Sequence, residues 1–314
     1  MPSAQPAATA IGPVGASTED VAGSSVLPSG PMATTTARPL RAARRPSSLG
    51  LIGEGLREIW SRRRLTGYLT RADLHKHGAD TILGNVWWLL DPLLQMAVYV
   101  VLVSVIFKIQ KPDYPLFVFC AILPWKWFAT AVNDGIMSVT SRERIIKQIK
   151  FPKIVLPVSA TLGGIVNFAF GLIPLFALML LFYSDRISLT LLLIPFIAVV
   201  QFVFSLGVAI VVAATNVFFR DIANVARHAL RLWFYLSPAL YQYSDVTHSD
   251  HGLLTTLFTL NPWTTLFESY RAVIYNGTQP PWGSLGLLLL GSFGLVAVAT
   301  LYFKRVEPSF AKVL

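Results

Sequence analysis

The chain has little charge for its length, and this decides its class. Only 13% of its 314 residues are charged, whereas 54% are hydrophobic and the mean hydropathy is +0.58. Soluble domains carry about 25% charged residues, so the composition predicts a protein of the lipid bilayer. The single cysteine, Cys120, lies in an apolar run, which excludes a disulfide framework and a thiolate metal site.

Motifs for catalysis and nucleotide binding are also missing. The sequence has no G-x-x-x-x-G-K-[ST] loop and no identifiable Ser-His-Asp set, so we expect no ATP bound by this chain itself. His248 and His251 lie near Asp245 and Asp250, but without a further ligand cluster they indicate a solvated loop rather than a metal site. We therefore expect a protein that is not an enzyme and binds neither a metal nor a cofactor.

Six apolar stretches are long enough to cross the bilayer as helices of roughly 20 residues. They are residues 87–109, 115–139, 154–183, 187–214, 223–243 and 283–303. Of the 26 Lys and Arg residues, 21 fall in segments that share one face of the membrane if the chain crosses it six times. Basic loops stay in the cytoplasm, so both termini are predicted to be cytoplasmic. Anionic lipid attracts each basic residue by about 1 kcal/mol, which explains the net charge of +10 without nucleic acid.

The segments before the spans differ in character. Residues 1–48 are rich in Ala, Pro, Ser, Thr and Gly without apolar periodicity, which predicts a disordered cytoplasmic extension. Residues 49–86 mix charges with Leu, Ile and Trp, which predicts helices at the cytoplasmic interface. Asp91 is expected to cap the first span, with Pro92 in its first turn.

Turn and helix signals organise the later part of the chain. Ser184-Asp185-Arg186 predicts a tight turn between the third and fourth spans. Gly163, Gly164, Gly171 and Pro174 predict either close packing of the third span or a kink in it. Residues 253–260 and a helix restarted at Asn261-Pro262 predict two short outer helices that enter the membrane and return, because neither is long enough to cross.

Two cytoplasmic loops carry local signals. In the first, a short basic amphipathic helix runs into a Phe-Pro break, the shape of a docking element for a soluble partner. Its candidate residues are Arg142, Glu143, Arg144, Ile145, Lys147, Phe151 and Pro152. In the second, Arg220 and Asp221 follow the fourth span and either anchor the loop at the inner headgroups or take part in gating.

Lys126 is a charge within a predicted span, and two interpretations remain open. Either it extends toward the headgroups between Trp125 and Trp127, or it faces a polar lumen and meets an anionic or hydroxyl-rich substrate. Asp134 lies in the same span, two helical turns away, and is too distant to pair with Lys126 directly.

Six short motifs follow one another over about residues 65–314. They are Gly84-x-x-Trp87-x-x-x-x-Asp91-Pro92, Pro124-Trp125-x-Trp127-Phe128, Lys150-Phe151-Pro152, Phe219-Arg220-Asp221, Ser237-Pro238 and Asn261-Pro262. In this order they resemble the membrane subunit of type-two ABC exporters for lipid-linked polysaccharides, a family that includes O-antigen, teichoic-acid and mycobacterial galactan exporters. The Ala-, Arg- and Pro-rich extension is common in high-GC actinobacteria and favours the galactan exporter.

The resemblance implies an all-α permease of the bacterial inner membrane with six spans. It implies a homodimer bound to two copies of a separate ATPase that holds ATP and Mg, moving a polyprenyl-pyrophosphate-linked glycan outward. The loop from Arg142 to Pro152 would couple to that ATPase. Aromatic side chains would line the glycan path, with the candidates Trp125, Trp127, Phe128, Trp233, Tyr235 and Tyr241, together with Lys126. Trp125 and Phe128 share a helix face that Trp127 does not, so at most two of these three face one lumen.

Two alternatives stay open. The same fold and partner would also suit an export permease for drugs or small lipids. A membrane-embedded transferase acting on polyprenyl-linked sugars would need grouped catalytic residues, and Asp91, Asp221 and Glu268 are widely scattered in the sequence.

Overall fold

The structure is a computed structural model that describes residues 47–79, 84–108, 111–242 and 252–314. Within these ranges the chain is helical and contains no strand. Five helical segments are long and apolar enough to cross a membrane: Trp87–Ile106, Tyr114–Thr140, Val155–Phe182, Leu189–Phe218 and Trp282–Val313. The predicted disorder of residues 1–48 falls almost wholly outside the described residues and stays a prediction.

Five of the six predicted spans are therefore confirmed as helices of sufficient length and apolarity. The fifth, 223–243, is not confirmed, because helix α8 runs only from Ile222 to Leu236, 15 residues. At 1.5 Å per residue it is roughly 22 Å long, less than the ~30 Å hydrocarbon core. Ser237 ends it in an extended conformation, as expected for a residue that precedes a proline.

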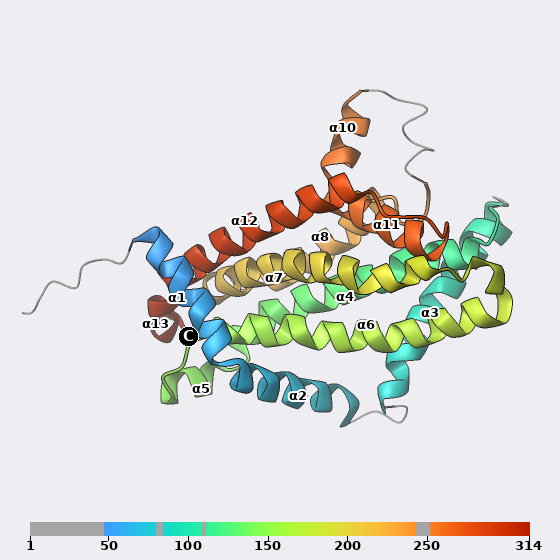
Figure 1. The fold of residues 1–314 in the computed structure, drawn as a ribbon. Coiled ribbons are helices and arrows are strands. Elements are labelled where there is room, and N and C mark those ends of the chain that lie inside the picture. The colour runs from blue at the N-terminus through green and yellow to red at the C-terminus, as the bar shows by residue number, and fades with distance from the viewer. Residues whose placement is uncertain (1–46, 80–83, 109–110, 243–251) are drawn as a thin grey trace, which may run out of the picture. The chain divides into compact units, whose positions relative to one another are not determined.

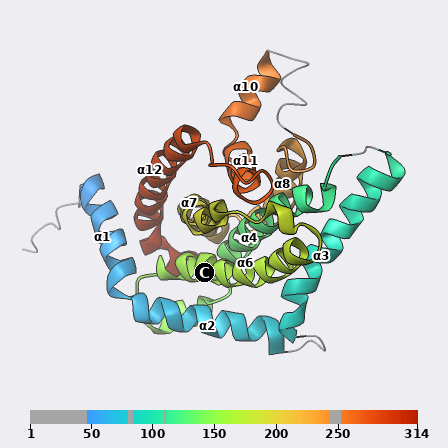
Figure 2. The same cartoon turned by 45° about the vertical axis from the view of Figure 1, so that its right-hand side comes forward.

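Helix α4 (Tyr114–Thr140) is the centre of the fold. It packs against α3 (Trp87–Val100), α6 (Val155–Phe182), α7 (Ile194–Phe218) and α8, as Figures 1 and 2 show. In its most apolar stretch of 18 residues, 78% of the residues are buried, against 17% in the corresponding stretch of the segment that contains α3. Aromatic rings fill the space around it, because wide apolar side chains bury most area per residue. The rings are Trp125, Phe128, Phe204, Trp233, Trp263 and Phe267.

The two predicted short helices are present as α10 (Leu253–Leu260) and α11 (Pro262–Ile274). The Asn261 side chain caps α11 by accepting from the Trp263 amide at 3.1 Å, and Pro262 occupies the first turn, so the predicted restart is confirmed. Arg271 on α11 is buried and donates to the carbonyls of Pro238 and Ala239, both at 2.6 Å. This arginine therefore satisfies buried carbonyls of the non-helical segment that follows α8. That α10 and α11 enter the membrane and return stays a proposal.

The predicted cap at Asp91 is wrong. Helix α3 begins at Trp87, after the 3₁₀ turn η1 (Gly84–Val86), so Asp91 and Pro92 lie inside it. The Asp-Pro pair does not distinguish the two positions, because proline is also tolerated inside membrane-spanning helices, where neighbouring groups satisfy the backbone that it leaves unpaired. The segment continues as a π-helix, η2 (Val101–Ile106).

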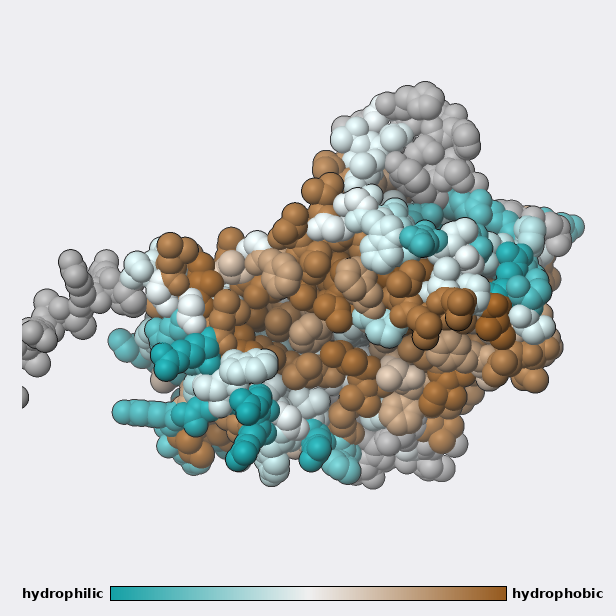
Figure 3. All heavy atoms as spheres, viewed as in Figure 1, coloured by the Kyte–Doolittle hydropathy of each residue, from teal (hydrophilic) through white to brown (hydrophobic). Residues whose placement is uncertain are grey.

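Polar elements gather at one end of the bundle. They are α1 (Ser48–Ser61), α2 (Arg63–Ala79), α5 (Glu143–Gln148) and α13 (Phe310–Val313). Lys304 Nζ on α12 (Trp282–Val306) donates to Glu58 Oε2 on α1 at 2.7 Å and so joins these two helices. The opposite end holds the predicted turn, formed by η3 (Ser184–Arg186), which with η4 (Leu189–Leu193) leads into α7. Figure 3 shows the face of the molecule seen in Figure 1. Apolar side chains cover its middle, along α6, α7 and α12, and hydrophilic residues lie toward both ends. This is the surface expected of a helix bundle within a bilayer.

Candidate functional site

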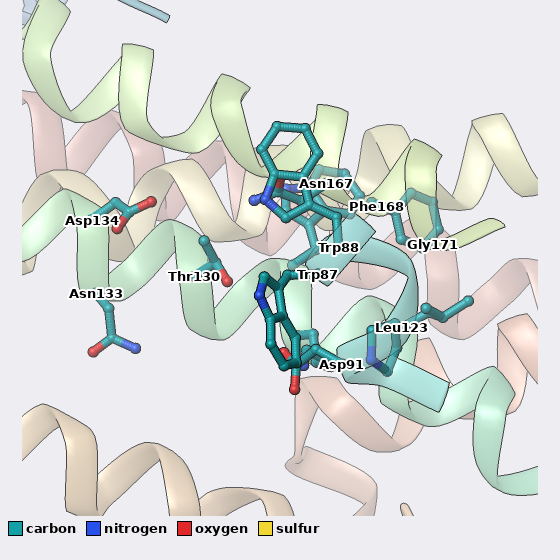
Figure 4. A pocket seen from close by; sticks show the side chains of 13 residues that line it. Trp87, Trp88, Asp91, Leu123, Thr130, Asn133, Asp134, Asn167, Phe168 and Gly171 are labelled. Carbon is teal, nitrogen blue, oxygen red and sulfur yellow. The ribbon is translucent and has the colours of Figure 1, made fainter. Parts of the chain in front are cut away.

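A cavity of about 480 Å³ with both polar and apolar lining residues lies between α3, α4 and α6, and we call it the α6-side cavity. Figure 4 shows its labelled side chains. Trp87, Trp88 and Asp91 come from α3, Lys126 and Asp134 from α4, and Asn167 from α6. A cavity of this size is in the range of small-molecule sites, and charged groups among apolar helices are a strong indication of function.

Lys126 forms an ion pair with Asp91 across this cavity. The Lys126 side chain is 27% exposed and that of Asp91 63%. A lysine at the centre of a spanning helix costs about 2.5–3.5 kcal/mol on insertion scales, and a paired carboxylate in a polar cavity offsets that cost. Lys126 therefore lines this cavity with a carboxylate partner, and its role toward a substrate stays a prediction.

A second cavity, the α2-side cavity of about 230 Å³, continues the first toward the end that carries α5. The two share Asp134 and Asn167 as lining residues. The second is also lined by Asp73 and Arg142, and both carboxylate oxygens of Asp73 accept from Arg142 Nη2 at 2.6 Å. Arg142, assigned from sequence to partner docking, thus connects the turn between α4 and α5 to α2.

A third cavity, the α8-side cavity of about 400 Å³, lies between α3, α4 and α8. Its wall on α8 carries Arg227, Arg231 and Tyr235, which are four residues apart and therefore share one helix face. Tyr99 on α3 approaches Tyr235, with 3.5 Å between the hydroxyl oxygens. Among the described residues that line this cavity none is acidic, so its charge is positive.

The aromatic residues predicted to line the glycan path lie in different places: some line one of these cavities, and others are buried in the core. Trp125 and Tyr235 line the α8-side cavity, whereas Trp127 lines the α6-side cavity and stacks on Phe168 at 5.0 Å. This confirms that Trp125 and Trp127 face different ways. Phe128 is fully buried and Trp233 packs edge-on against it, so these two belong to the core.

Tyr241, the remaining aromatic candidate, lies near the end of α8. Its ring packs against Phe258 of α10 at 6.1 Å, and its carbonyl accepts from Arg271 at 3.4 Å. It lines none of the three cavities described above.

The predicted docking loop has the expected form. Helix α5 ends before the non-helical Phe151 and Pro152, and Phe151 is partly buried against the core. Arg144 and Ile145 are exposed, as a partner contact requires. Lys147 donates to Glu143 at 2.6 Å, and this hydrogen bond lowers the pKa of the Glu143 carboxyl.

Arg220 and Asp221 form an exposed turn between α7 and α8. The charge of Arg220 also helps to lower the pKa of Glu143, so this turn lies at the same end of the bundle as α5. Docking or gating by these residues stays a prediction.

Sequence reasoning missed Arg227, Arg231, Asn133 and Asn167 as lining residues. The spacing of the two arginines and Tyr235 was a readable signal, since every fourth residue lies on one helix face. Asn133 lines both the α6-side and the α8-side cavity, which only the packing of three helices reveals. Among the described residues no three His, Cys, Asp or Glu side chains could hold a metal together; the loop with His248 and His251 lies outside them.

Several helices long and apolar enough to span a membrane, with charged side chains lining the cavities between them, are typical of multi-pass membrane proteins that move a substrate. The sequence comparisons specify the family: residues 64–275 match the family described as ABC-2 type transporter, and the chain belongs to it. Its relatives include the O-antigen export system permease protein RfbA of Myxococcus xanthus, 32% identical over 257 residues that cover 82% of this chain and 98% of the relative. Two proteins of the same name from Klebsiella pneumoniae are 30% and 29% identical over 247 residues, covering 78% of this chain and 93% of each relative.

Proposed function

We propose that the chain is the permease subunit of an ATP-driven exporter for a polyprenyl-pyrophosphate-linked polysaccharide, with galactan as the preferred substrate. The observation that carries this proposal is the similarity to O-antigen export permeases over nearly their whole length. The chain would act in the bacterial inner membrane, with both termini in the cytoplasm.

The α8-side cavity suits such a substrate. Two guanidinium groups one turn apart can bind a diphosphate, because arginine matches the geometry of phosphate oxygens. Tyr235 beside them, which is exposed, offers a flat apolar face and a hydroxyl group, and such a surface holds sugars without fixing one register. We infer that the lipid-linked diphosphate and its first sugars pass along this side of α4.

The energy would come from a separate ATPase, because the sequence has no phosphate-binding loop of its own. Two copies of that subunit, holding ATP and Mg, would bind a homodimer of this chain. Helix α5, with exposed Arg144 and Ile145, is the docking element in this proposal, and Phe151 transmits its movement to the core.

The alternatives fit less well. A permease for drugs or small lipids would favour an apolar cavity, whereas the α8-side cavity presents two arginines. A transferase would require its acidic residues together. Instead Asp91 pairs with Lys126, Asp221 is exposed in the turn before α8, and Glu268 lies beside Arg271.

Complementation of a deletion strain tests the proposal. Cells without the chain should accumulate lipid-linked polysaccharide inside and lose it from the surface, and the wild-type gene should restore it. The double variant Arg227→Gln/Arg231→Gln should lower surface polysaccharide by about tenfold or more, while Arg227→Lys/Arg231→Lys, which keeps the charge, should retain part of it. Unchanged surface polysaccharide in the deletion strain would refute the proposed function.

A further inference from the structure

We propose that Lys304 and Glu307 are positioning residues for the step that couples ATP hydrolysis to transport. They lie at the end of α12 and in the 3₁₀ turn η5 (Glu307–Ser309) that follows it, and they join α1 to the chain directly after the docking loop, Arg142 to Pro152. We call these two residues, with Glu58 and Lys153, the Lys304 cluster. The inference rests on the proposed function, because it requires that an ATPase subunit moves α5.

The Glu307 carboxylate uses its two oxygens for two different segments. Oε1 accepts from the backbone N–H of Lys153 at 2.9 Å and lies 3.8 Å from Lys153 Nζ. Oε2 accepts from Lys304 Nζ at 3.2 Å. Glu307 is buried, so water competes little for these charge-assisted bonds, which are both strong and directional. Because Lys153 directly follows Pro152, Glu307 fixes the point at which the docking loop returns to the bundle.

The Lys304 ammonium extends this link to α1. Its side chain is only 8% exposed, and three carboxylates lie within 3.3 Å of Nζ: Glu58 at 2.7 Å, Glu307 at 3.2 Å and Glu54 at 3.3 Å. A lysine has three N–H donors, so its hydrogen-bonding capacity is filled. Glu54 is more than half exposed and contributes little, since water screens such a pair. Glu58 and Glu307 therefore carry the connection.

Helix α1 also packs closely on this end of α12, and Figures 1 and 2 show the two side by side. A Cβ atom at Gly55 would lie 2.4 Å from Thr300 Cγ2 and 3.6 Å from Ile154 Cδ1, so the close approach depends on glycine. Ile154 follows Lys153 and is fully buried. Helix α1 is thus seated on α12 and on the start of α6, at the place where the Lys304 cluster lies.

The docking loop is held by a carboxylate on each side of α5. Before α5, Arg142 pairs with Asp73 of α2; after it, the Lys153 amide binds Glu307. Within the described residues only the second partner belongs to a segment long and apolar enough to span a membrane, Trp282–Val313. We therefore place the coupling role in the Lys304 cluster, which connects the docking loop to a spanning helix.

An apolar group of side chains lies beneath the cluster and explains what the ions add. Ile146 of α5 is buried in the same group as Phe303 and Phe310, and Phe151 packs against it. Apolar contact is non-directional, so this group alone holds α5 in place without fixing its position along the helix end. Packed side chains together with ion-pair networks transmit movement between distant sites. The Lys304 cluster supplies the directional part.

Proteoliposomes that contain the full-length chain, the ATPase subunit and lipid-linked glycan extracted from the deletion strain test the inference. ATP hydrolysis and the appearance of glycan on the far leaflet are measured together. Lys304→Met and Glu307→Ala should leave assembly and hydrolysis intact but lower the glycan moved per ATP by about fivefold or more. Lys304→Arg and Glu307→Gln, which keep donors or an acceptor, should retain part of it. Lys312→Met, which removes an exposed lysine from the same end, should leave the ratio unchanged.

Hydrogen exchange of the Lys153 amide gives a readout that does not depend on transport. Glu307→Ala removes the acceptor of this N–H, so its exchange should become about tenfold faster, as measured by mass spectrometry of peptides that contain Lys153. Lys312→Met should not change it. Equal exchange in wild type and Glu307→Ala would show that Glu307 does not hold the docking loop and would overturn the inference.

The ratio of glycan moved to ATP hydrolysed decides the role of the cluster. An unchanged ratio in Lys304→Met and Glu307→Ala would overturn the inference, as would a loss of transport only in proportion to lost assembly or lost hydrolysis, which indicates a purely structural role. If Lys304→Met does not assemble, Glu58→Gln, which weakens only the contact with α1, decides by the same ratio. Wild-type transport with unchanged variants would reject this inference alone. No transport by the assembled, hydrolysing wild-type complex would reject the proposed function and the coupling role with it.

Discussion

Replacing Gly164 by Ala should push the Trp127 ring out of its position beside the α6-side cavity. A Cβ atom at Gly164 would lie 2.4 Å from Trp127 Cδ1 and 2.7 Å from Nε1. Carbon atoms in good contact are about 3.5–4.0 Å apart, so either the ring or α6 must move. A Cβ atom added at the adjacent Gly163 would have no atom within 4 Å. Gly163→Ala is therefore a matched control.

The expected difference follows from two effects. Both substitutions remove a helical glycine, which stabilises each variant by about 0.5–1 kcal/mol. Only Gly164→Ala adds overpacking, which costs about 1–3 kcal/mol. Gly164→Ala should therefore be about 1–3 kcal/mol less stable than Gly163→Ala. At about 2–4 °C per kcal/mol for domains of 150–250 residues, its midpoint should be lower by about 2–12 °C.

Thermal unfolding in nanodiscs, followed by tryptophan fluorescence and by the fraction that remains monodisperse, measures this difference. If Gly164→Ala is as stable as Gly163→Ala or more stable, the packing of α4 against α6 is not as described.

The remaining predictions concern other parts of the molecule. Arg271→Met should destabilise the chain by about 2–6 kcal/mol, because it leaves the carbonyls of Pro238 and Ala239 without their donor and each such buried carbonyl costs about 1–3 kcal/mol; thermal unfolding checks this, and wild-type stability would contradict it. Arg144→Glu should weaken binding of the ATPase subunit about tenfold, whereas Lys108→Glu at the opposite end should not; equal co-purification of both would remove α5 from the interface. Deletion of residues 1–45 should leave membrane insertion intact in a protease-protection assay, and loss of insertion would reject the predicted extension.

The periodicity and turn chemistry of the sequence predict the elements that depend on local interactions. Asn261-Pro262 starts α11 as expected, because an asparagine cap and a first-turn proline act within three residues. The turn at Ser184–Arg186 is also local. The helical repeat is enough to place Trp125 and Trp127 on different faces.

Features that join distant segments could not be read from the sequence. Lys126 pairs with Asp91, 35 positions away, and Arg142 pairs with Asp73, 69 positions away. Each pair depends on how two helices are oriented, which hydropathy does not encode. The early end of α8 was only partly predictable from the sequence. Ser237-Pro238 indicates a break in the helix, but the apolar residues beyond it favour a longer span.

The central claim is that this chain carries a lipid-linked polysaccharide across the membrane with energy from a separate ATPase. Its most direct test is reconstitution of the purified chain with that subunit in proteoliposomes, followed by the appearance of lipid-linked glycan on the far leaflet. The account predicts ATP-dependent transport that needs both proteins, ATP hydrolysis only when the ATPase subunit is present, and transport reduced about tenfold or more by Arg227→Gln/Arg231→Gln. Tight ATP binding by the chain alone, or no transport by a fully assembled and hydrolysing complex, would contradict it.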